Sequence, residues 1–291
     1  MKLADARVTV IGIGLMGGSL AKALEGKAAS LTGVDHDRDT IEYARAMGIF
    51  DHVGASVSEG LAHCDLAILA VPVKGIIDLI KRIGEGLPAP RFLLDLGSTK
   101  TAITRHMETL PDRVDPIGGH PLCGTETAGI QASDAAIFQG SIFALNPLER
   151  TSRECLHLAE ELVRFLGAHP IILGAEEHDR LAAITSHLPY LLTAALTQTA
   201  KDMESTDQHL AEMIASGFMD TTRVAASGVE MIGDVLLSNQ SNVLRALNRF
   251  SENAQTLAGL IEAGNMDALH EHLLPIQRWR ALLSKPGIRE T

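Results

Sequence analysis

Cysteine, positive charge and long apolar runs are all scarce in this sequence. Its 291 residues include three cysteines, none at disulfide-framework or zinc-motif spacing, which indicates free thiols in a reducing compartment and no metal site. The net charge of −11 argues against nucleic acid or an anionic membrane as the main partner. No apolar run approaches the roughly 18 residues of a membrane span, and Asp5 and Arg7 interrupt any apolar region of a signal peptide. We therefore expect a cytoplasmic protein.

The two halves of the chain have different patterns. Short β-branched runs alternate with helical stretches up to residue 174, which predicts an α/β Rossmann domain with a doubly wound parallel sheet over residues 1–174. Residues 175–291 show helical apolar spacing, most clearly at 241–264, and no strand signal, which predicts an all-helical second domain. Helices this apolar favour a homodimer through that domain. The expected strands cover residues 7–12, 30–35, 66–71, 92–97, 114–119, 141–147 and 169–174.

A glycine-rich segment, "VTVIGIGLMGGSLAKAL", predicts a dinucleotide site. Gly12, Gly14 and Gly17 have the GxGxxG spacing of a tight turn, a close approach to a pyrophosphate and close helix–strand packing. Asp35 ends the next predicted strand, where a carboxylate binds a ribose 2′-hydroxyl and repels a 2′-phosphate, so NAD is favoured over NADP. The alternative is a glycine turn beside a surface aspartate. Further expected cofactor contacts are Leu15, Met16, Val71, Pro72 and Val73.

A second glycine-rich segment, "GGHPLCGTETAG", holds the candidate catalytic residue His120. We expect it to meet the "DLGSTK" loop, with Ser98 and Lys100, at the carboxyl ends of the strands, where ligands bind in such sheets. Oxidation of an alcohol by NAD needs a base for the hydroxyl proton, and a histidine suits that role near neutral pH. The alternative is a structural histidine in a turn.

Five motifs, in order and spacing, resemble those of the prephenate/arogenate dehydrogenase family over roughly residues 6–280: "GIGLMGGSLA", "DLGSTK", "GGHPLCGTETAG", "HDRLAAITSHLPY" and "GFMDTTRVAAS". The resemblance implies a Rossmann domain followed by a helical dimerisation domain. It implies that His120 accepts the proton of the substrate ring hydroxyl and that Ser98 contacts this hydroxyl or His120. Hydride then passes to NAD and carbon dioxide leaves, which yields 4-hydroxyphenylpyruvate or tyrosine in tyrosine biosynthesis.

The same resemblance implies the substrate contacts. Arg223 would bind a substrate carboxylate, helped by Lys100, and Glu126 would pair with that arginine at the mouth of the site. Taken alone, Arg223 also fits a surface salt bridge and Glu126 an exposed loop acid. His178 and His187 are interpreted as structural, with His178 bracing the first helix of the second domain. The other expected substrate contacts are Gly124, Thr125, Ser186 and Tyr190.

Three positions depart from the family pattern. Tyr190 stands where a histidine is frequent, Met219 where an arginine is common, and Ile232 where many members have tryptophan. Fewer cations near the substrate favour arogenate over prephenate, and another substituted prephenate is also compatible. A β-hydroxyacid dehydrogenase is the alternative enzyme, although no lysine of the helical half has the matching context. A non-catalytic NAD-binding protein is the remote alternative, and the presence of both His120 and Ser98 argues against it.

Overall fold

The computed structural model describes residues 1–124, 127–204, 206–207 and 209–283. The chain forms two compact units, one from residue 1 to 242 and one from residue 243 onward. Each unit is described below by itself.

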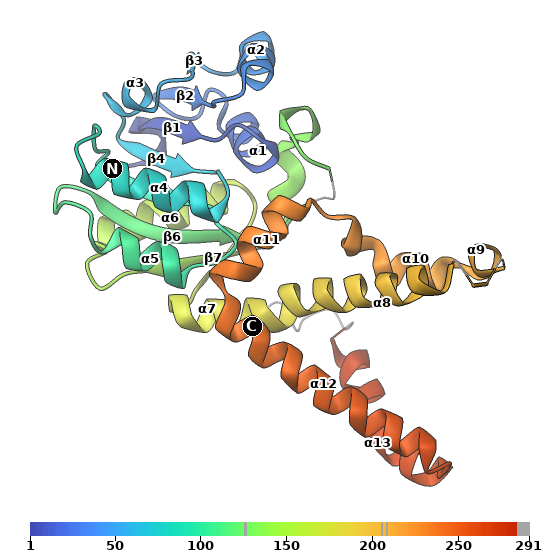
Figure 1. Ribbon diagram of the computed structural model, residues 1–291. Helices are drawn as coiled ribbons and strands as arrows, with labels where there is room; N and C mark the ends of the chain where they lie inside the picture. The colour runs from blue at the N-terminus through green and yellow to red at the C-terminus, as the bar shows by residue number, and fades with distance from the viewer. Residues whose placement is uncertain (125–126, 205, 208, 284–291) are drawn as a thin grey trace. The chain divides into compact units, whose positions relative to one another are not determined.

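The first unit is built on an eight-stranded sheet in the order β3-β2-β1-β4-β5-β6-β7-β8 (Figure 1). All seven predicted strands are present. The eighth, β3, was not predicted, because its sequence His-Val-Gly has no apolar run from which a strand can be recognised. The strands are β1 (Arg7–Ile11), β2 (Ser30–Val34), β3 (His52–Gly54), β4 (Leu66–Leu69), β5 (Phe92–Asp95), β6 (Asp115–Pro121), β7 (Ile142–Pro147) and β8 (His169–Ile172).

The predicted parallel pairing is confirmed from β3 across to β6, but β7 runs antiparallel to β6. A parallel return needs a crossover connection, usually a helix, whereas the described chain between β6 and β7 contains only the short turns η2 (Ile130–Ala132) and η3 (Ala135–Phe138). β8 is again parallel to β7. The antiparallel step places His120 opposite Ala144 in the register.

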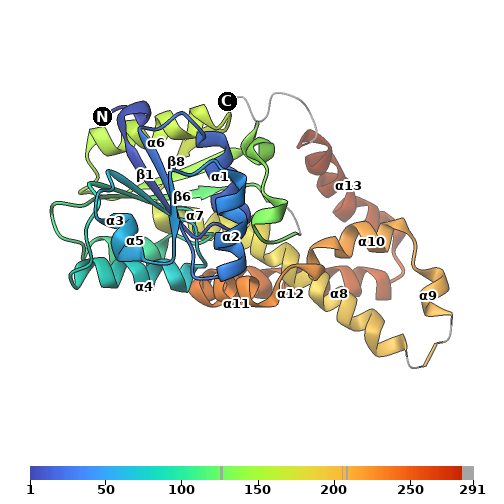
Figure 2. The same cartoon turned by 90° about the horizontal axis from the view of Figure 1, so that it is seen from above.

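Helices cover both faces of the sheet, which confirms the doubly wound arrangement. Buried side chains of α1 and α6, including Leu20 and Leu158, form one apolar cluster with the strands. Side chains of α3, α4 and α5, including Ile76 and Ile103, form a second cluster on the other face. Figure 2 shows α6 and α4 on opposite sides of the strands. The helices are α1 (Leu15–Leu24), α2 (Arg38–Met47), α3 (Val57–Leu61), α4 (Val73–Gly84), α5 (Thr101–Met107) and α6 (Arg153–Phe165).

Beyond β8 the described chain is helical, as predicted. In the first unit, α11 packs against the start of α4, where the Asp234 carboxylate accepts a hydrogen bond from the Lys74 N–H at 2.9 Å. The predicted domain boundary at residues 174/175 falls between β8 and α7 and stays a prediction. The elements are α7 (Ala175–Ala182), the π-helical segment η4 (Ala183–His187), α8 (Leu188–Glu204), α9 (Leu210–Met213), α10 (Ser216–Thr222), η5 (Arg223–Ala226), α11 (Val229–Ser238), α12 (Gln240–Glu262) and α13 (Met266–Leu282).

The second unit consists of α12 from Val243 onward and α13. Large apolar side chains are exposed along both helices: Leu244 is 50% exposed, Ile261 68% and Trp279 63%. No helix of the described chain is both long enough and apolar enough to cross a membrane.

Candidate active site

The glycine turn between β1 and α1 has the properties predicted for a dinucleotide site. Gly12 has a φ of +91°, and a β-carbon there would lie 2.6 Å from the Ala70 carbonyl oxygen, so the turn requires glycine. A β-carbon on Gly17 would collide with the Gly12 carbonyl oxygen, so α1 packs closely on β1. Gly14 caps α1 and has no atom within 4 Å of its β-carbon position. This open helix N-terminus fits a pyrophosphate.

The Asp35 carboxylate lies against this turn, directly after β2. Its Oδ2 accepts a hydrogen bond from the Ile13 N–H at 2.8 Å, and its Oδ1 accepts one from the Asp37 N–H at 3.0 Å. Each oxygen keeps acceptor capacity for a hydroxyl. A cavity of about 340 Å³, lined also by Val71 and Pro72, adjoins the carboxylate. The site therefore fits a ribose that donates hydrogen bonds to Asp35.

A second cavity, of about 330 Å³, extends along the start of α1 and reaches Ser98. Five separate chain segments form its walls: the start of α1, the β4–α4 junction, the loop after β5, residues 127–129 and residues from Ser227 to Val235. The structure thus brings together the predicted apolar cofactor contacts, which are Leu15, Met16, Val71, Pro72 and Val73.

The predicted catalytic residues share a third cavity, of about 400 Å³. Ser98 lines both this cavity and the second one, so it lies at their junction. His120 was predicted to follow its strand, but it belongs to β6 and is paired with β7, whose ladder holds its backbone in place. The predicted substrate residues on the wall of this cavity are Gly124, Ser186 and Tyr190.

The remaining predicted substrate residues are placed differently. Thr125 and Glu126 lie outside the described residues. Arg223 begins η5 and is exposed. It is not among the described residues that line the third cavity, whereas Val224 and Ser227 from the same short segment are.

A hydrogen-bonded chain of three side chains leads away from His120. Its Nδ1 lies 2.9 Å from Nε2 of His178, and Nδ1 of His178 lies 2.9 Å from Oδ1 of Asp179. The Asp179 carboxylate also accepts hydrogen bonds from the N–H groups of Lys100 at 2.7 Å and Thr101 at 2.8 Å. His178 therefore contacts the candidate catalytic histidine directly, which sequence reasoning missed when it assigned His178 to bracing a helix.

The charges along this chain follow from its surroundings. Burial lowers the pKa of His120 well below the usual 6.5, and the nearby His178, Lys100 and His187 lower it further. Burial alone would raise the pKa of Asp179, but the hydrogen bonds that its carboxylate accepts outweigh this and lower the pKa. At neutral pH, Asp179 is therefore ionised and the His120 imidazole is neutral.

Lys100 does not face the substrate cavity, so the expected help to Arg223 is wrong. Its side chain and that of Asp95 have no exposed surface, and its Nζ donates hydrogen bonds to the Asp95 carboxylate and, at 2.5 Å, to the Gly119 carbonyl oxygen. Burial lowers the pKa of Lys100 and raises that of Asp95, while their mutual attraction opposes both shifts. The pair is part of the support beneath β6.

A second hydrogen-bonded chain starts from the backbone of Asp179. Its carbonyl oxygen accepts a hydrogen bond from Nδ2 of Asn239 at 2.7 Å, and the same Nδ2 lies 3.3 Å from Nδ1 of His187. His187 was interpreted as structural, but it lines the third cavity. It belongs to the π-helical segment η4, and such segments are frequent at functional sites.

Part of the wall of the third cavity is apolar. Val224, Met231 and Leu236 line it, together with Ile232, one of the three departures from the family pattern. Tyr190 also lines this cavity, whereas Met219, on α10, is 60% exposed and is not among its described lining residues. No lysine or arginine of the described chain lies on this wall.

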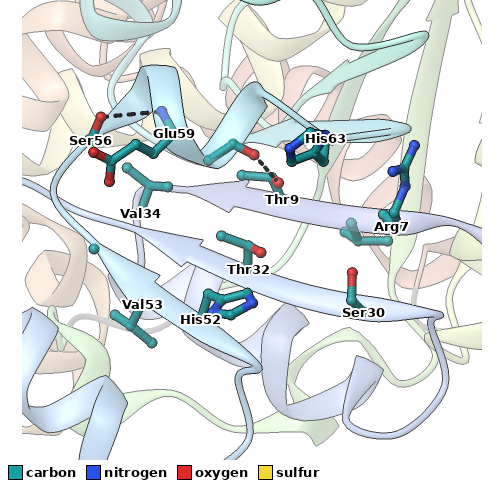
Figure 3. Close-up of a pocket in the computed structure, with 13 residues that line it drawn as sticks. Arg7, Thr9, Ser30, Thr32, Val34, His52, Val53, Ser56, Glu59 and His63 are labelled. Carbon is teal, nitrogen blue, oxygen red and sulfur yellow. Dashed lines mark hydrogen bonds between the residues drawn. The ribbon is translucent and has the colours of Figure 1, made fainter.

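Another cavity, of about 450 Å³, lies under the short helix α3 on the face of β1, β2 and β3 (Figure 3). Its Arg7 is ion-paired with Asp65 at 2.8 Å, and Thr9 donates a hydrogen bond to the Gly60 carbonyl oxygen at 2.7 Å. This cavity runs alongside the strands, from Ser30 to Val34 of β2 for example, whereas ligands bind beyond the carboxyl ends of the strands in such sheets. The active-site assignment therefore stays with the cavities that meet at Ser98.

Comparisons with known proteins agree with this geometry. Residues 20–172 match the family described as "Prephenate dehydrogenase, nucleotide-binding domain", and residues 174–274 match "Prephenate dehydrogenase, dimerization domain". A cyclohexadienyl dehydrogenase from Zymomonas mobilis is 28% identical over 95% of each chain. A crystal structure of prephenate dehydrogenase from A. aeolicus with hydroxyphenyl propionate and NAD⁺ has a TM-score of 0.89, 29% identity, and coverage of 98% of this chain and 100% of that one. Arogenate dehydrogenase from Synechocystis has a TM-score of 0.80 and 28% identity over 95% of this chain and 99% of that one.

Proposed function

This chain belongs to the prephenate dehydrogenase family, and on that premise we propose that it catalyses the NAD-dependent oxidative decarboxylation of prephenate or arogenate, with His120 as the proton acceptor. The products would be 4-hydroxyphenylpyruvate and tyrosine, respectively. The observation that carries the proposal is the position of Ser98, where the cavity that fits the dinucleotide meets the cavity that holds His120.

The state of His120 suits proton acceptance. Because its imidazole is partly buried and lies near other basic groups, its pKa is low and the ring is neutral at neutral pH. Its Nδ1 bonds to His178, so Nε2 is the nitrogen left for the ring hydroxyl. Ser98 lines the same cavity and supports the proposed contact with this hydroxyl or with His120.

The residues of the dinucleotide site fit NAD, and the A. aeolicus relative was crystallised with NAD⁺. NAD, when bound, supplies the hydride acceptor for the ring carbon. Departure of carbon dioxide then makes the ring aromatic, which provides much of the driving force. The protein's own part is to orient the ring, hold the acceptor nitrogen in place and exclude water. The anionic Asp35 favours NAD over NADP, because it would repel a 2′-phosphate.

Substrate binding is proposed for the residues around the third cavity. Ser186, Tyr190 and the backbone at Gly124 line it. Arg223 is proposed to bind a carboxylate with its planar guanidinium, because it adjoins Val224, which lines the cavity. Thr125 and Glu126 are retained as proposed contacts from the sequence.

The candidate substrates differ in the side chain that the ring carries. Tyr190 and Ile232 leave this part of the cavity neutral and apolar, which supports arogenate, or another amino-substituted prephenate, over the bare keto acid of prephenate. A β-hydroxyacid dehydrogenase stays as the alternative enzyme.

We further propose a cytoplasmic homodimer. The exposed apolar side chains of α12 and α13 provide a surface for a second copy, and the matched family model is described as a dimerization domain. The three cysteines are unpaired, in keeping with a reducing compartment.

The test is NADH formation by purified protein, with prephenate and arogenate each supplied with NAD or NADP. The proposal requires turnover of at least one substrate and faster turnover with NAD. Absence of turnover with both substrates, in protein that still binds NAD, would reject the substrate class while leaving the dinucleotide site intact.

A further inference from the structure

Two imidazoles line the third cavity, and their hydrogen-bond partners differ in kind. His120 bonds through Nδ1 to another imidazole, and His187 bonds through Nδ1 to a side-chain amide. Both chains of hydrogen bonds end on Asp179, one at its carboxylate and one at its carbonyl oxygen. Tracing the donors from Asp179 outward determines where each imidazole carries its proton.

The first chain sets the proton of His120. An ionised carboxylate only accepts hydrogen bonds, and Asp179 already accepts two from backbone N–H groups. Nδ1 of His178 must therefore be the donor to Asp179, and with one proton on each ring Nε2 of His178 is the acceptor. Nδ1 of His120 then donates to that nitrogen, and the lone pair of His120 lies on Nε2.

The second chain sets the proton of His187 in the opposite sense. Only the NH₂ group of Asn239 can donate to the Asp179 carbonyl oxygen, so the orientation of this amide is determined. The same NH₂ group faces Nδ1 of His187, which must therefore accept. A neutral His187 then carries its proton on Nε2.

Both Nε2 atoms are open to the cavity. Among the described residues, the Asn146 side-chain oxygen is the buried side-chain polar atom without a hydrogen-bond partner. Nε2 of His120 and Nε2 of His187 also have no hydrogen-bond partner in the described chain, but unlike the Asn146 oxygen they are not fully buried. Since both side chains line the third cavity, these nitrogens are available to a ligand there.

We propose that Asp179 fixes these two imidazoles in opposite tautomers, so that His120 presents a proton acceptor and His187 a proton donor to the same substrate. This inference rests on the proposed function for the identity of the substrate. His178, Asp179 and Asn239 are positioning residues, and His187 is a substrate contact that donates a hydrogen bond to a substrate oxygen.

The arrangement has a consequence for the charge formed in the reaction. When Nε2 of His120 takes the hydroxyl proton, the ring becomes an imidazolium whose Nδ1–H still donates to His178. Passing that proton to Nε2 of His178 leaves His120 neutral and moves the positive charge beside the Asp179 carboxylate. The chain thereby offsets the burial that makes a cation at His120 unfavourable. Meanwhile Nε2–H of His187 supplies polarity on a wall without lysine or arginine in the described chain.

The direct test is side-chain ¹⁵N NMR of the full-length protein labelled at histidine, at mildly alkaline pH. The signals of the two rings are assigned by their loss in His120→Asn and His187→Gln. The proposal requires a proton on Nδ1 of His120 and on Nε2 of His187. The opposite tautomer at either ring would overturn it, and this readout does not depend on turnover of any substrate.

Kinetic variants test whether the positioning matters. His178→Phe fills the space but cannot accept from His120, so kcat should fall about a hundredfold or more, within the range of general-base catalysis. His178→Gln keeps an acceptor and should recover at least about tenfold of that loss, with NAD affinity close to wild type in both. Equal impairment by Phe and Gln, or none by Phe, would indicate a space-filling role and contradict the proposal.

Asn239→Leu removes the amide that orients His187 and its hydrogen bond to the Asp179 carbonyl oxygen, but it keeps the Asp179 carboxylate to which His178 is bonded. The KM of the oxidised substrate should rise about tenfold while kcat stays within about threefold. An unchanged KM would contradict the donor role of His187. His63 is exposed, follows α3 in the chain and is not among the residues that line the third cavity, so His63→Phe is the control and should leave both constants unchanged. If wild-type protein oxidises neither substrate, the proposed function fails while the NMR result still decides the tautomers.

Discussion

Replacing Lys100 with methionine should destabilise the protein strongly and leave substrate affinity nearly unchanged. The change removes the ammonium group beside Asp95, and neither side chain has any exposed surface through which water can replace it. Asp95 would keep only the N–H groups of Gly97, at 2.8 Å, and Gly119, at 3.4 Å, among its described hydrogen bonds. Removing one partner of a buried ion pair costs about 3–5 kcal/mol, so we expect a loss of that size in the free energy of unfolding.

The loss should depend on pH, because Asp95 can escape its unpaired charge by taking up a proton. Burial already raises the pKa of this carboxyl, and loss of Lys100 would raise it further. An acid whose pKa is higher in the folded than in the unfolded state binds more protons when folded, so stability falls as pH rises between the two values. The difference between Lys100→Met and wild type should therefore be larger at about pH 8 than at about pH 5.

Urea unfolding of Lys100→Met and of Lys81→Met at both pH values measures this difference. Lys81 lies on the exposed side of α4, and its replacement should change stability by no more than about 0.5 kcal/mol. Equal stability of the two variants, or a rise in KM with normal stability for Lys100→Met, would refute the burial argument and return Lys100 to the substrate.

Three further predictions follow from the dinucleotide site and from His120. Gly12→Ala should lower both stability and NAD affinity, because the added β-carbon would collide with backbone atoms. Gly14→Ala should weaken NAD binding alone, because its β-carbon would lie in open space. Unfolding curves and NAD titrations measure both effects, and equal stability of the two variants would contradict this prediction. Asp35→Asn should reduce the preference for NAD over NADP in kcat/KM by about tenfold, the value of one charged hydrogen bond, and an unchanged ratio would exclude the ribose contact. In the pH profile of kcat/KM, the loss of activity on the acidic side should occur below about pH 6.5. The reason is that burial and the nearby His178, Lys100 and His187 lower the pKa of His120 and keep the ring neutral. Loss of activity already above that pH would contradict the low pKa.

Local patterns were sufficient to predict most of the fold and the dinucleotide site. The GxGxxG spacing identified Gly12, Gly14 and Gly17 because each glycine meets a local steric demand of a strand–turn–helix unit. Apolar periodicity likewise predicted the strands and the helical half, since burial of a strand or a helix face shows in consecutive residues. β3 was not predicted because its three residues are too few to show the apolar periodicity of a strand.

The support of His120 depends on contacts that no local pattern contains. His178 lies 58 residues from His120, and Asn239 lies 60 residues from Asp179. Only the folded chain shows that the Asp179 carboxylate reaches the start of α5, where it accepts hydrogen bonds from the N–H groups of Lys100 and Thr101. The burial of Lys100 was missed for the same reason. A lysine in a polar loop is expected to be exposed, and only the folded structure shows that this one is fully buried.

The most direct test of the central claim is single-turnover NADH formation by His120→Asn, with NAD affinity measured on the same preparation and His63→Asn as control. Asparagine has no basic nitrogen, so we expect NAD to bind normally and the rate of NADH formation to fall by about a hundredfold or more, as loss of a general base requires. Turnover at the wild-type rate in His120→Asn would show that another group accepts the proton, and it would contradict the mechanism.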